Sequence, residues 1–383
     1  MKITDVETFI FSAAHHNANR NWVIVKINTD DGLYGLGDAS GLGNDHQVIS
    51  LIDEMAEAFL IGRDPMDSEA IWTQIYYNNQ SRGGRIDTTA LSGIDIALWD
   101  LKGKALGLPV YKLLGGAQRE KVRVYANGWY TNPGSPELNA EEAKKVVAMG
   151  YTAMKFDPFA QNNYYNISLE EADIAEDRVA AVREAVGPNV DILIEVHAKF
   201  STGTAISLGQ RLEKYRPLWF EEPTSQENVA EMKFVRDRVN IPIATGERLY
   251  TKFPFYELVA ADAVDVLQPD IANAGGITEL KKIAAIAEAR HVNMAPHNTC
   301  SPVGTMAECH LDLTITNFLI QEYHAEFYTP HYFDAFDGFP RQVDGYLTVP
   351  DTPGLGLTIN EEVLAAHGYD TTVTARAGTS RRI

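Results

Sequence analysis

The sequence is short of cysteine, of long apolar runs and of positive charge. Its 383 residues include only two cysteines, too few for a disulfide framework, so we expect Cys300 and Cys309 to be buried thiols. No apolar run approaches the roughly 20 residues of a membrane-spanning helix. Residues 1–9 alternate like a strand and lack the apolar centre of a signal peptide. We therefore expect a cytoplasmic protein that has no membrane partner.

Acidic residues outnumber basic ones, and the formal net charge at pH 7 is −19. This excess disfavours nucleic acid and anionic membranes as partners, because their phosphates carry the same sign. It does not exclude an anionic substrate, because a bound cation can invert the local field. The apolar fraction of 45% is typical of a soluble globular protein, and the length favours two domains or one domain with a large cap.

The first part of the chain predicts an α+β module over residues 1–120. Alternating apolar residues indicate strands at 3–11, 22–27 and 33–37, with a hairpin turn at 29–32. The polar stretch 12–21 is predicted to be a loop whose side chains could reach a ligand. From residue 45 to residue 106 the apolar period becomes helical, and the last helix is expected to end at Gly107.

After Arg119 short apolar strands alternate with amphipathic helices, and eight such strands follow one another up to residue 327. This alternation is typical of an α/β fold, a (β/α)8-type barrel, here over residues 121–327. The tail, residues 328–383, returns to irregular chain rich in Gly, Pro and aromatics. We expect it to pack back on the N-terminal module and to complete a capping domain.

Polar side chains stand at the end of the predicted strands, where barrel enzymes place their active sites. From Glu195 onward, taking one residue per strand, the positions are separated by 23 residues (247 to 270) up to 27 residues (270 to 297), about one per βα unit. Any one of them could be a helix cap, a structural ion pair or a core histidine. Their common phase favours a single site. In chain order they are Lys155, Asp157, Glu195, His197, Glu221, Glu222, Glu247, Arg248, Asp270, His297 and Glu322.

Two chemistries follow from these residue types. Glu195, Glu221 and Glu247 on consecutive strands cannot all stay ionised at close range without a cation, and an all-oxygen set suits Mg²⁺ better than Zn²⁺. Asp270 and His297 follow neighbouring strands and can pair. A carboxylate behind an imidazole fixes its tautomer, which makes a general base.

The ordered motifs resemble the enolase superfamily, mandelate racemase subgroup, over nearly the whole chain. Three further stretches, 125–130, 154–159 and 191–195, are most similar to sugar acid dehydratases of the gluconate and galactonate type. The motifs that carry the superfamily resemblance are the helix 90–104, Trp-Phe-Glu-Glu-Pro at 219–223, Gly-Glu-Arg at 246–248, Leu-Gln-Pro-Asp at 267–270 with the glycine pair 275–276, Ala-Pro-His at 295–297 and the return at 353–357.

The resemblance implies a role for each strand-end residue. Glu195, Glu221 and Glu247 would hold Mg²⁺. His297, oriented by Asp270, would remove the proton next to the substrate carboxylate, and His197 would protonate the departing 3-hydroxyl. Lys155 and Glu322 would contact the carboxylate end and help to stabilise the enediolate intermediate.

Two departures from the subgroup bear on the reaction. Asp157 stands where racemases carry a second lysine, which disfavours a two-base exchange. Glu195 stands where the subgroup more often has an aspartate, so this metal ligand reaches about one methylene further.

We therefore expect dehydration of a sugar acid to a 2-keto-3-deoxy acid. An epimerase or racemase, or a cycloisomerase acting on a related lactone or anhydro acid, stays open as an alternative, as does a non-catalytic homologue. The family commonly forms homo-oligomers, which we expect here too. Candidate substrate-lining residues are Asp157, Asn127, Trp129, Arg20, Tyr164 and His324.

Overall fold

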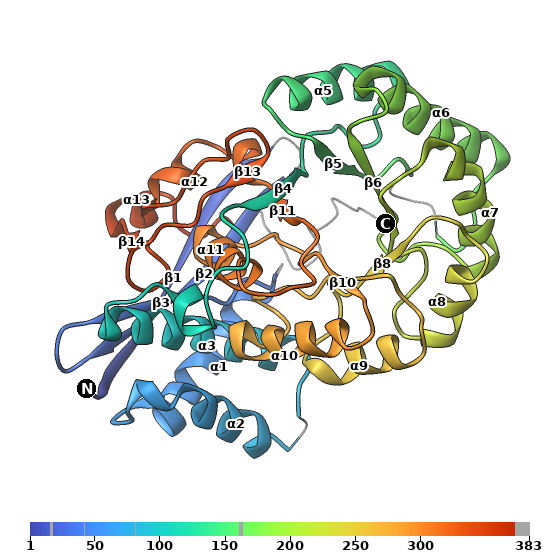
Figure 1. The fold of residues 1–383 in the computed structure, drawn as a ribbon. Coiled ribbons are helices and arrows are strands. Elements are labelled where there is room, and N and C mark those ends of the chain that lie inside the picture. Colours follow the sequence, from blue (N-terminus) through green and yellow to red (C-terminus); the bar gives the residue numbers. More distant parts are fainter. Residues whose placement is uncertain (16–17, 42, 81, 161–163, 372–383) are drawn as a thin grey trace.

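The protein folds into an eight-stranded barrel with an α+β cap along one side (Figure 1). The structure is a computed structural model that describes residues 1–15, 18–41, 43–80, 82–160 and 164–371. The cap contains the strands β1 (Ile3–His15), β2 (Ala18–Thr29) and β3 (Tyr34–Asp38), the helices α1 (Asp45–Met55), α2 (Ser68–Asn78), α3 (Arg85–Leu106) and α4 (Val110–Leu113), a π-helical turn at Ala56–Leu60 and a 3-10 turn at Pro65–Asp67.

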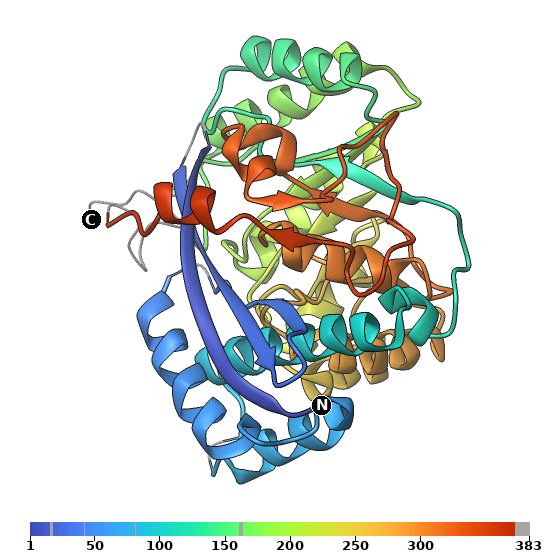
Figure 2. The same ribbon diagram turned by 90° about the vertical axis from the view of Figure 1, so that its left-hand side faces the viewer.

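The β1–β2 hairpin extends further than the sequence predicted, and the loop expected at 12–21 was wrong. Phe11 pairs with Trp22, and the ladder continues through Ala13 opposite Arg20 to His15 opposite Ala18. Polar residues form strand here because the chain around 329–331 and 367–370 lies against them. The Thr329 amide donates to the Ala14 carbonyl, the Ala14 amide donates to the Thr329 hydroxyl oxygen, and the Ser12 amide donates to the His367 carbonyl. Figure 2 shows this long ribbon beside the barrel, with α13 (Glu361–Ala366) crossing β1.

Helix α3 lies against the cap sheet at a contact made of glycines. A Cβ added to Gly37 of β3 would stand 1.9 Å from the Gly93 carbonyl oxygen of α3, so the two backbones touch directly. Glycine is needed there for space, since neither residue has a positive φ. The helix ends before Gly107, which has φ +67° and caps the last turn as the sequence predicted.

The barrel strands are parallel and follow one another in sequence order around the sheet. The first and last strands pair with each other, Glu322 lying opposite Tyr125. Between the seventh and eighth strands the ring closes through a parallel bridge from Met294 to Phe318. The strands are β4 (Val122–Ala126), β5 (Ala153–Phe156), β6 (Asp191–Glu195), β7 (Trp219–Glu221), β8 (Ile243–Thr245), β9 (Val266–Leu267), β10 (Asn293–Met294) and β11 (Gln321–Tyr323).

One helix follows each of the first seven barrel strands, and these helices form the outer ring in Figure 1. Four of them begin at serines (135, 168, 201 and 301) whose side chains accept a backbone N–H of the first turn. The helices are α5 (Pro136–Ala148), α6 (Leu169–Val186), α7 (Thr202–Leu212, continued by a 3-10 turn at Glu213–Tyr215), α8 (Val229–Arg236), α9 (Lys252–Ala260), α10 (Gly276–Glu288) and α11 (Pro302–Asp312).

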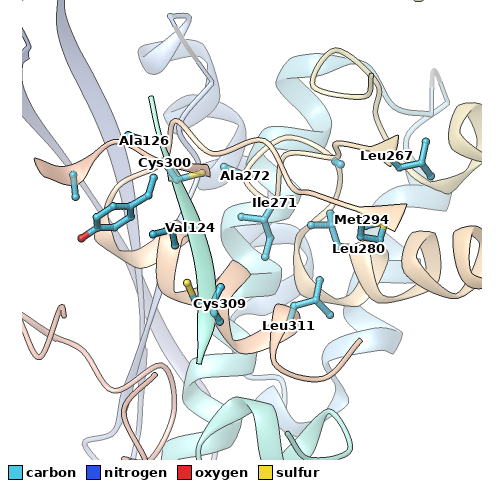
Figure 3. Packing of buried hydrophobic residues seen from close by; sticks show 14 of the residues in the cluster. Val124, Ala126, Leu267, Ile271, Ala272, Leu280, Met294, Cys300, Cys309 and Leu311 are labelled. Atoms are coloured by element: carbon cyan, nitrogen blue, oxygen red, sulfur yellow. The ribbon is translucent and has the colours of Figure 1, made fainter. Parts of the chain in front are cut away.

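Apolar side chains fill both sides of the barrel wall. Figure 3 shows part of the outer layer, where Val124 of β4 and Met294 of β10 lie in one buried cluster with residues of the helices. Cys300 and Cys309 belong to the same cluster, and both are buried free thiols, as expected. A separate inner cluster takes one residue from each strand or its flank: Tyr125, Ala153, Leu193, Trp219, Ala244, Val266, Ala295 and Ile320.

The tail joins the barrel to the cap. Its strand β13 (Tyr346–Leu347) pairs antiparallel with β4, and its short helix α12 (His331–Asp334) places the Tyr332 hydroxyl on the Cys300 carbonyl. The remaining tail elements are a 3-10 turn at Ala325–Phe327, β12 (Phe336–Asp337) and β14 (Thr358–Ile359), which pair with each other, and α13. Within the part of the chain that the structure describes, no helix is long and apolar enough to cross a bilayer.

Candidate active site

At the barrel mouth, inward-pointing polar residues form a layer directly above the inner apolar cluster. Side chains on a strand alternate, so a residue two positions after an inward apolar residue also points inward. Leu193 is followed in this way by Glu195, Trp219 by Glu221 and Ala295 by His297. The same offset relates Tyr125 to Asn127, Ala153 to Lys155 and Ile320 to Glu322. The barrel register therefore gathers residues far apart in the sequence at one end of the ring.

Two of these residues, Glu195 and Glu221, form a carboxylate cluster with Glu247, which follows the neighbouring strand β8. Glu195, Glu221 and Glu247 offer oxygen atoms that all lie within 4.8 Å of one another, and the first two side chains are buried. The backbone amides of Val196 and His197 donate to Oε1 of Glu195 at 2.9 and 2.7 Å. Oε2 of Glu195 is buried and has no hydrogen-bond partner among the described residues, although the Lys155 ammonium lies 3.2 Å away from it. Such an atom in an all-oxygen cluster fits a hard divalent cation such as Mg²⁺.

Lys155 lies among the acids. Its Nζ is 2.6 Å from Glu221, 3.2 Å from Glu195 and 3.1 Å from Glu322. Burial alone would lower the pKa of Lys155, but the carboxylates of Glu221 and Glu322 raise it well above the usual value. Burial and the charge of Glu195 likewise raise the pKa of Glu221 well above its usual value, although Lys155 opposes this. A single ammonium group therefore does not neutralise the cluster, which leaves room for a further positive charge.

Glu247 is held by an arginine that also neutralises a deeper acid. Arg248 Nη2 lies 2.9 Å from Glu247, and its Nε donates to Glu222 at 2.8 Å. Burial is the main reason that the pKa of Glu222 rises to about 8, with Glu247 adding to it. Glu222 and Arg248 thus support the cluster from behind and fix the direction in which Glu247 points.

His297 forms the expected pair with Asp270. Its Nδ1 is 2.8 Å from Asp270 Oδ2, while its Nε2 faces Glu247 at 3.3 Å. The side chain of Asp270 is 2% exposed and that of His297 9%. Burial lowers the pKa of His297, but the charges of Glu247, Glu322 and Asp270 outweigh it and raise the pKa to about 9. A cation among the carboxylates would offset that field and favour the neutral, basic form.

His197 has a similar carboxylate behind it, which the sequence analysis did not assign. Its Nδ1 lies 2.9 Å from Asp157 Oδ2, and Lys199 donates to the same oxygen at 2.5 Å. The remaining oxygen of Asp157 accepts the Phe159 amide. Asp157 was expected to contact substrate, which stays a prediction; its side chain is fully buried and bound to His197 and Lys199, a position from which it can orient the His197 ring. His197 itself is 41% exposed and has φ +55°, a strained conformation of the kind found at functional sites.

The two histidines lie on opposite sides of the mouth. His197 follows β6 and His297 follows β10, and these strands are four positions apart in a ring of eight. The carboxylates of Glu195, Glu221 and Glu247 occupy the arc between them. A small acid bound to a cation in that arc would therefore have one imidazole on each face.

Glu322 is surrounded by donors. Asn127 Nδ2 donates to its Oε1 at 2.6 Å and the Asn298 amide donates to its Oε2 at 2.8 Å. His324 Nε2 lies 3.3 Å from Oε1. Burial raises the pKa of Glu322, but Lys155 and His297 bring it well below the usual value, so it stays ionised. Asn127 and His324 are thus placed at the site, as supports of Glu322.

The other residues that were expected to line the substrate site lie in different surroundings. Trp129 is buried and its Nε1 donates to the Lys155 carbonyl at 2.8 Å, which makes it part of the wall. Tyr164 is 55% exposed, and Arg20 extends from the cap hairpin. Sequence reasoning missed Lys199 and Asn298. Asn298 could have been found from its position directly after His297. Nothing in the sequence marked Lys199, because the strand ends at Glu195 and the backbone at His197 and Ala198 has φ +55°.

Comparison with known proteins agrees with the family resemblance seen in the sequence, and it covers most of the chain. Residues 3–115 match the mandelate racemase/muconate lactonizing enzyme N-terminal domain, and residues 139–363 match the enolase C-terminal domain-like family. The D-gluconate dehydratase of Thermoproteus tenax is 41% identical over 89% of this chain and 69% of that protein. The D-gluconate/D-galactonate dehydratase of Picrophilus torridus is 38% identical over 91% of this chain and 88% of its own.

Solved structures agree with the fold. A mandelate racemase/muconate lactonizing enzyme from Jannaschia superposes with a TM-score of 0.90 at 33% identity, covering 97% of this chain and 98% of that one. A member of the enolase superfamily from Salmonella Typhimurium gives 0.87 at 36% identity, covering 95% and 97%. The chain belongs to the mandelate racemase/muconate lactonizing enzyme family of the enolase superfamily.

Proposed function

We propose that the protein is a hydro-lyase that dehydrates a sugar acid, an aldonate such as gluconate, galactonate or a pentonate, to the 2-keto-3-deoxy acid. The observation that carries this proposal is the pair of carboxylate-backed histidines on opposite sides of the barrel mouth. Dehydration needs a base for the proton at C2 and an acid for the hydroxyl at C3. The relatives named as gluconate, galactonate and xylonate dehydratases support the same substrate class.

Glu195, Glu221 and Glu247 would hold the Mg²⁺ that this chemistry needs. The close spacing of their oxygens, among which Lys155 supplies a single positive charge, supports that assignment. When bound, a divalent cation supplies Lewis acidity toward the substrate carboxylate, which makes the neighbouring C2 proton easier to remove.

His297 then acts as the base. Asp270 holds Nδ1 with its proton, so Nε2 is the nitrogen that takes the proton from C2. Negative charge moves onto the substrate carboxylate as the C2–H bond breaks. The Lys155 ammonium, with its raised pKa, stays protonated beside that charge and stabilises it.

His197 acts as the acid on the other face. Burial lowers its pKa, but Glu195 and Asp157 raise it above the usual value, so the ring carries the proton that it must give. The proton passes to the C3 hydroxyl, the C3–O bond breaks and water leaves. The resulting enol becomes the 2-keto-3-deoxy acid, so the sugar acid is split into that product and one water.

A second outcome, epimerisation at C2, is favoured by the same facing histidines, because two bases on opposite faces can exchange one proton. The position of Asp157 weighs against it. Asp157 binds both His197 and Lys199, so the lysine beside that histidine is already paired with a carboxylate and is not available as a second base.

The test is a 2-keto-acid assay, read as the semicarbazone, with Mg²⁺ and stereoisomeric aldonates and aldarates of five and six carbons. We expect one or a few stereoisomers to give product. Appearance of the C2 epimer without keto acid would favour the epimerase, and no reaction by folded protein across the panel would contradict both.

A further inference from the structure

The barrel wall is interrupted next to the proposed base. Strands β9 and β10 have two residues each, and β10 meets the chain that leads into β11 through the single bridge from Met294 to Phe318. This ladder cannot continue toward the mouth in the same way, because Pro296 has no N–H to donate. His297 therefore follows a strand end that backbone pairing with β11 does not fix.

A buried polar pair crosses this interruption on the outer side of the wall. Gln321 points outward, because Ile320 before it points into the barrel and side chains on a strand alternate. Its Nε2 donates at 2.7 Å to Oε2 of Glu308, a fully buried residue of α11. The same Nε2 lies 3.3 Å from the Pro296 carbonyl oxygen and 3.2 Å from the Glu322 carbonyl oxygen. Gln321 thus bonds to the strand end that Pro296 leaves without a ladder.

Glu308 extends the connection to the carboxylate behind the base. Its Oε1 accepts the amide of Ile271 at 3.2 Å, and Ile271 directly follows Asp270. The chain segments that carry Asp270, His297 and Glu322 are therefore joined through one carboxyl group and one amide. All three of these residues point into the site, while the pair that joins their backbones lies behind the wall.

The surroundings of this pair are apolar. Leu267, Met294 and Leu311, which Figure 3 shows, belong to the buried layer between the strands and the outer helices, together with Val303 and Ala307 of α11. Burying a carboxyl and an amide in such a layer costs free energy that apolar side chains would not. The hydrogen bonds between polar groups recover only part of that cost. The pair is therefore better explained by the geometry that it fixes than by the stability that it adds.

We propose that Glu308 and Gln321 are positioning residues that hold the His297–Asp270 dyad in place relative to Glu322. The expected effect on rate rests on the proposed function, whereas the geometry of the dyad can be observed without turnover. The base must lie close to the C2 hydrogen, and a misplacement of about 1 Å can lower a rate by about 100-fold. Loss of either polar side chain frees the end of β10 or the turn after β9 to move by part of that distance.

The kinetic test compares wild type, Glu308→Gln and Gln321→Met in the Mg²⁺-loaded protein. Glu308→Gln leaves one acceptor oxygen for two donors, and Gln321→Met keeps a long side chain without its N–H groups. Each variant should lower kcat by roughly 10- to 100-fold and leave KM unchanged, because the metal ligands and Lys155 stay in place. The rate is expressed per Mg²⁺ site, counted by titration calorimetry, so unfolded protein does not contribute.

The matched control is Asp312→Asn. Asp312 is a buried acid one turn further along α11, and neither of its carboxyl oxygens has a hydrogen-bond partner within the described part of the chain. Changing it alters the same helix without touching the strand ends. This variant should keep the wild-type kcat.

The second measurement needs no substrate. The proton between Nδ1 of His297 and Asp270 is observed at the low-field end of the ¹H NMR spectrum and is assigned by its loss in His297→Asn. Its resonance should shift or broaden in Glu308→Gln and Gln321→Met, and it should stay unchanged in Asp312→Asn.

Three results would overturn the inference. They are a wild-type kcat in both variants, a lowered kcat with an unmoved resonance, and an equal loss of kcat in Asp312→Asn, which would show a general sensitivity of α11. A wild-type protein that turns over none of the sugar acids would instead overturn the proposed function. The resonance alone would then decide whether the pair positions the dyad.

Discussion

His197 and His297 each have one ring nitrogen bound by a buried carboxylate and the other turned toward the barrel mouth. The pairing of His297 with Asp270 was predictable, because both residues end neighbouring strands. The pairing of His197 with Asp157 was not, since the sequence suggested that Asp157 meets substrate. What the sequence could not show is that Lys199, beyond the strand, would turn back onto Asp157 and fix it behind the ring.

We predict that His297→Asn abolishes proton removal from C2 while leaving Mg²⁺ binding intact, because Asn keeps a polar side chain but not a base. The measurement is exchange of the C2 hydrogen in D₂O, followed by NMR, with Mg²⁺ affinity determined by titration calorimetry. Persistent C2 exchange at the wild-type rate would remove His297 from the role of base.

His197→Asn should lower dehydration far more than C2 exchange, because the base would still form the carbanion but the hydroxyl would have no acid. General acid–base groups typically contribute about 100- to 10,000-fold, so the loss of keto acid should fall in that range. Asp157→Asn should give a smaller loss of the same kind, since the ring remains but its orienting charge does not. The assignment fails if the variant dehydrates and exchanges at wild-type rates.

The buried His310 should make the folded protein less stable at acidic pH. Burial lowers its pKa to about 4, with the Leu355 carbonyl opposing, and its ring links the Tyr111 amide to the tail. In the unfolded chain the imidazole of His310 has its ordinary pKa of about 6.5, so it takes up a proton at a higher pH than in the folded protein. The contribution of His310 to the free energy of unfolding is therefore fully present above about pH 6.5. It falls as the pH drops toward about 4, by up to about 3 kcal/mol. Denaturant unfolding of His310→Gln between pH 7 and 4 should show a weaker pH dependence than wild type, and equal slopes would contradict this.

At the scale of elements, helix α3 packs on the cap sheet through direct backbone contact. The close approach of β3 and α3 at Gly37 and Gly93 leaves no room for a Cβ. The sequence showed both elements and the end of α3 at Gly107, but a glycine that serves as a space requirement looks like any other. The sequence did not predict the hairpin beyond Phe11, because the residues that hydrogen-bond to it come from the tail, more than 300 residues away.

Gly37→Ala should destabilise the protein by at least the 1–3 kcal/mol typical of overpacking, since the new methyl group would meet the Gly93 carbonyl. The matched control is Gly203→Ala on α7, where an added Cβ would meet nothing within 4 Å. That variant should be neutral or slightly stabilising. Thermal unfolding measures both, and an unchanged midpoint for Gly37→Ala would mean that α3 can move away from the sheet.

At the scale of the whole molecule, the barrel gathers carboxyl groups in one small region of a chain that is already strongly acidic. The sequence predicted this convergence because the strand period set it, and the register then placed Glu195, Glu221 and Glu322 one layer above an apolar residue. The homo-oligomer expected from the resemblance stays a prediction, which light scattering would test.

Mg²⁺ should raise the unfolding temperature in a saturable way, because it binds the folded carboxylate cluster and not the unfolded chain. At 100 times the dissociation constant the stabilisation would be about 2.7 kcal/mol. Glu221→Gln should remove most of this effect, whereas Glu170→Gln on the exposed face of α6 should leave it intact. An equal Mg²⁺ effect in both variants would place the ion elsewhere.

The central claim is that the two histidines act in sequence on a sugar acid. The most direct measurement is an NMR time course of the Mg²⁺-loaded wild-type protein with its best aldonate in D₂O, recording C2 exchange in remaining substrate and appearance of keto acid together. The account predicts a 2-keto-3-deoxy acid as the product, with its formation abolished in His297→Asn. Deuterium at C2 of recovered substrate with no keto acid at any time would contradict it.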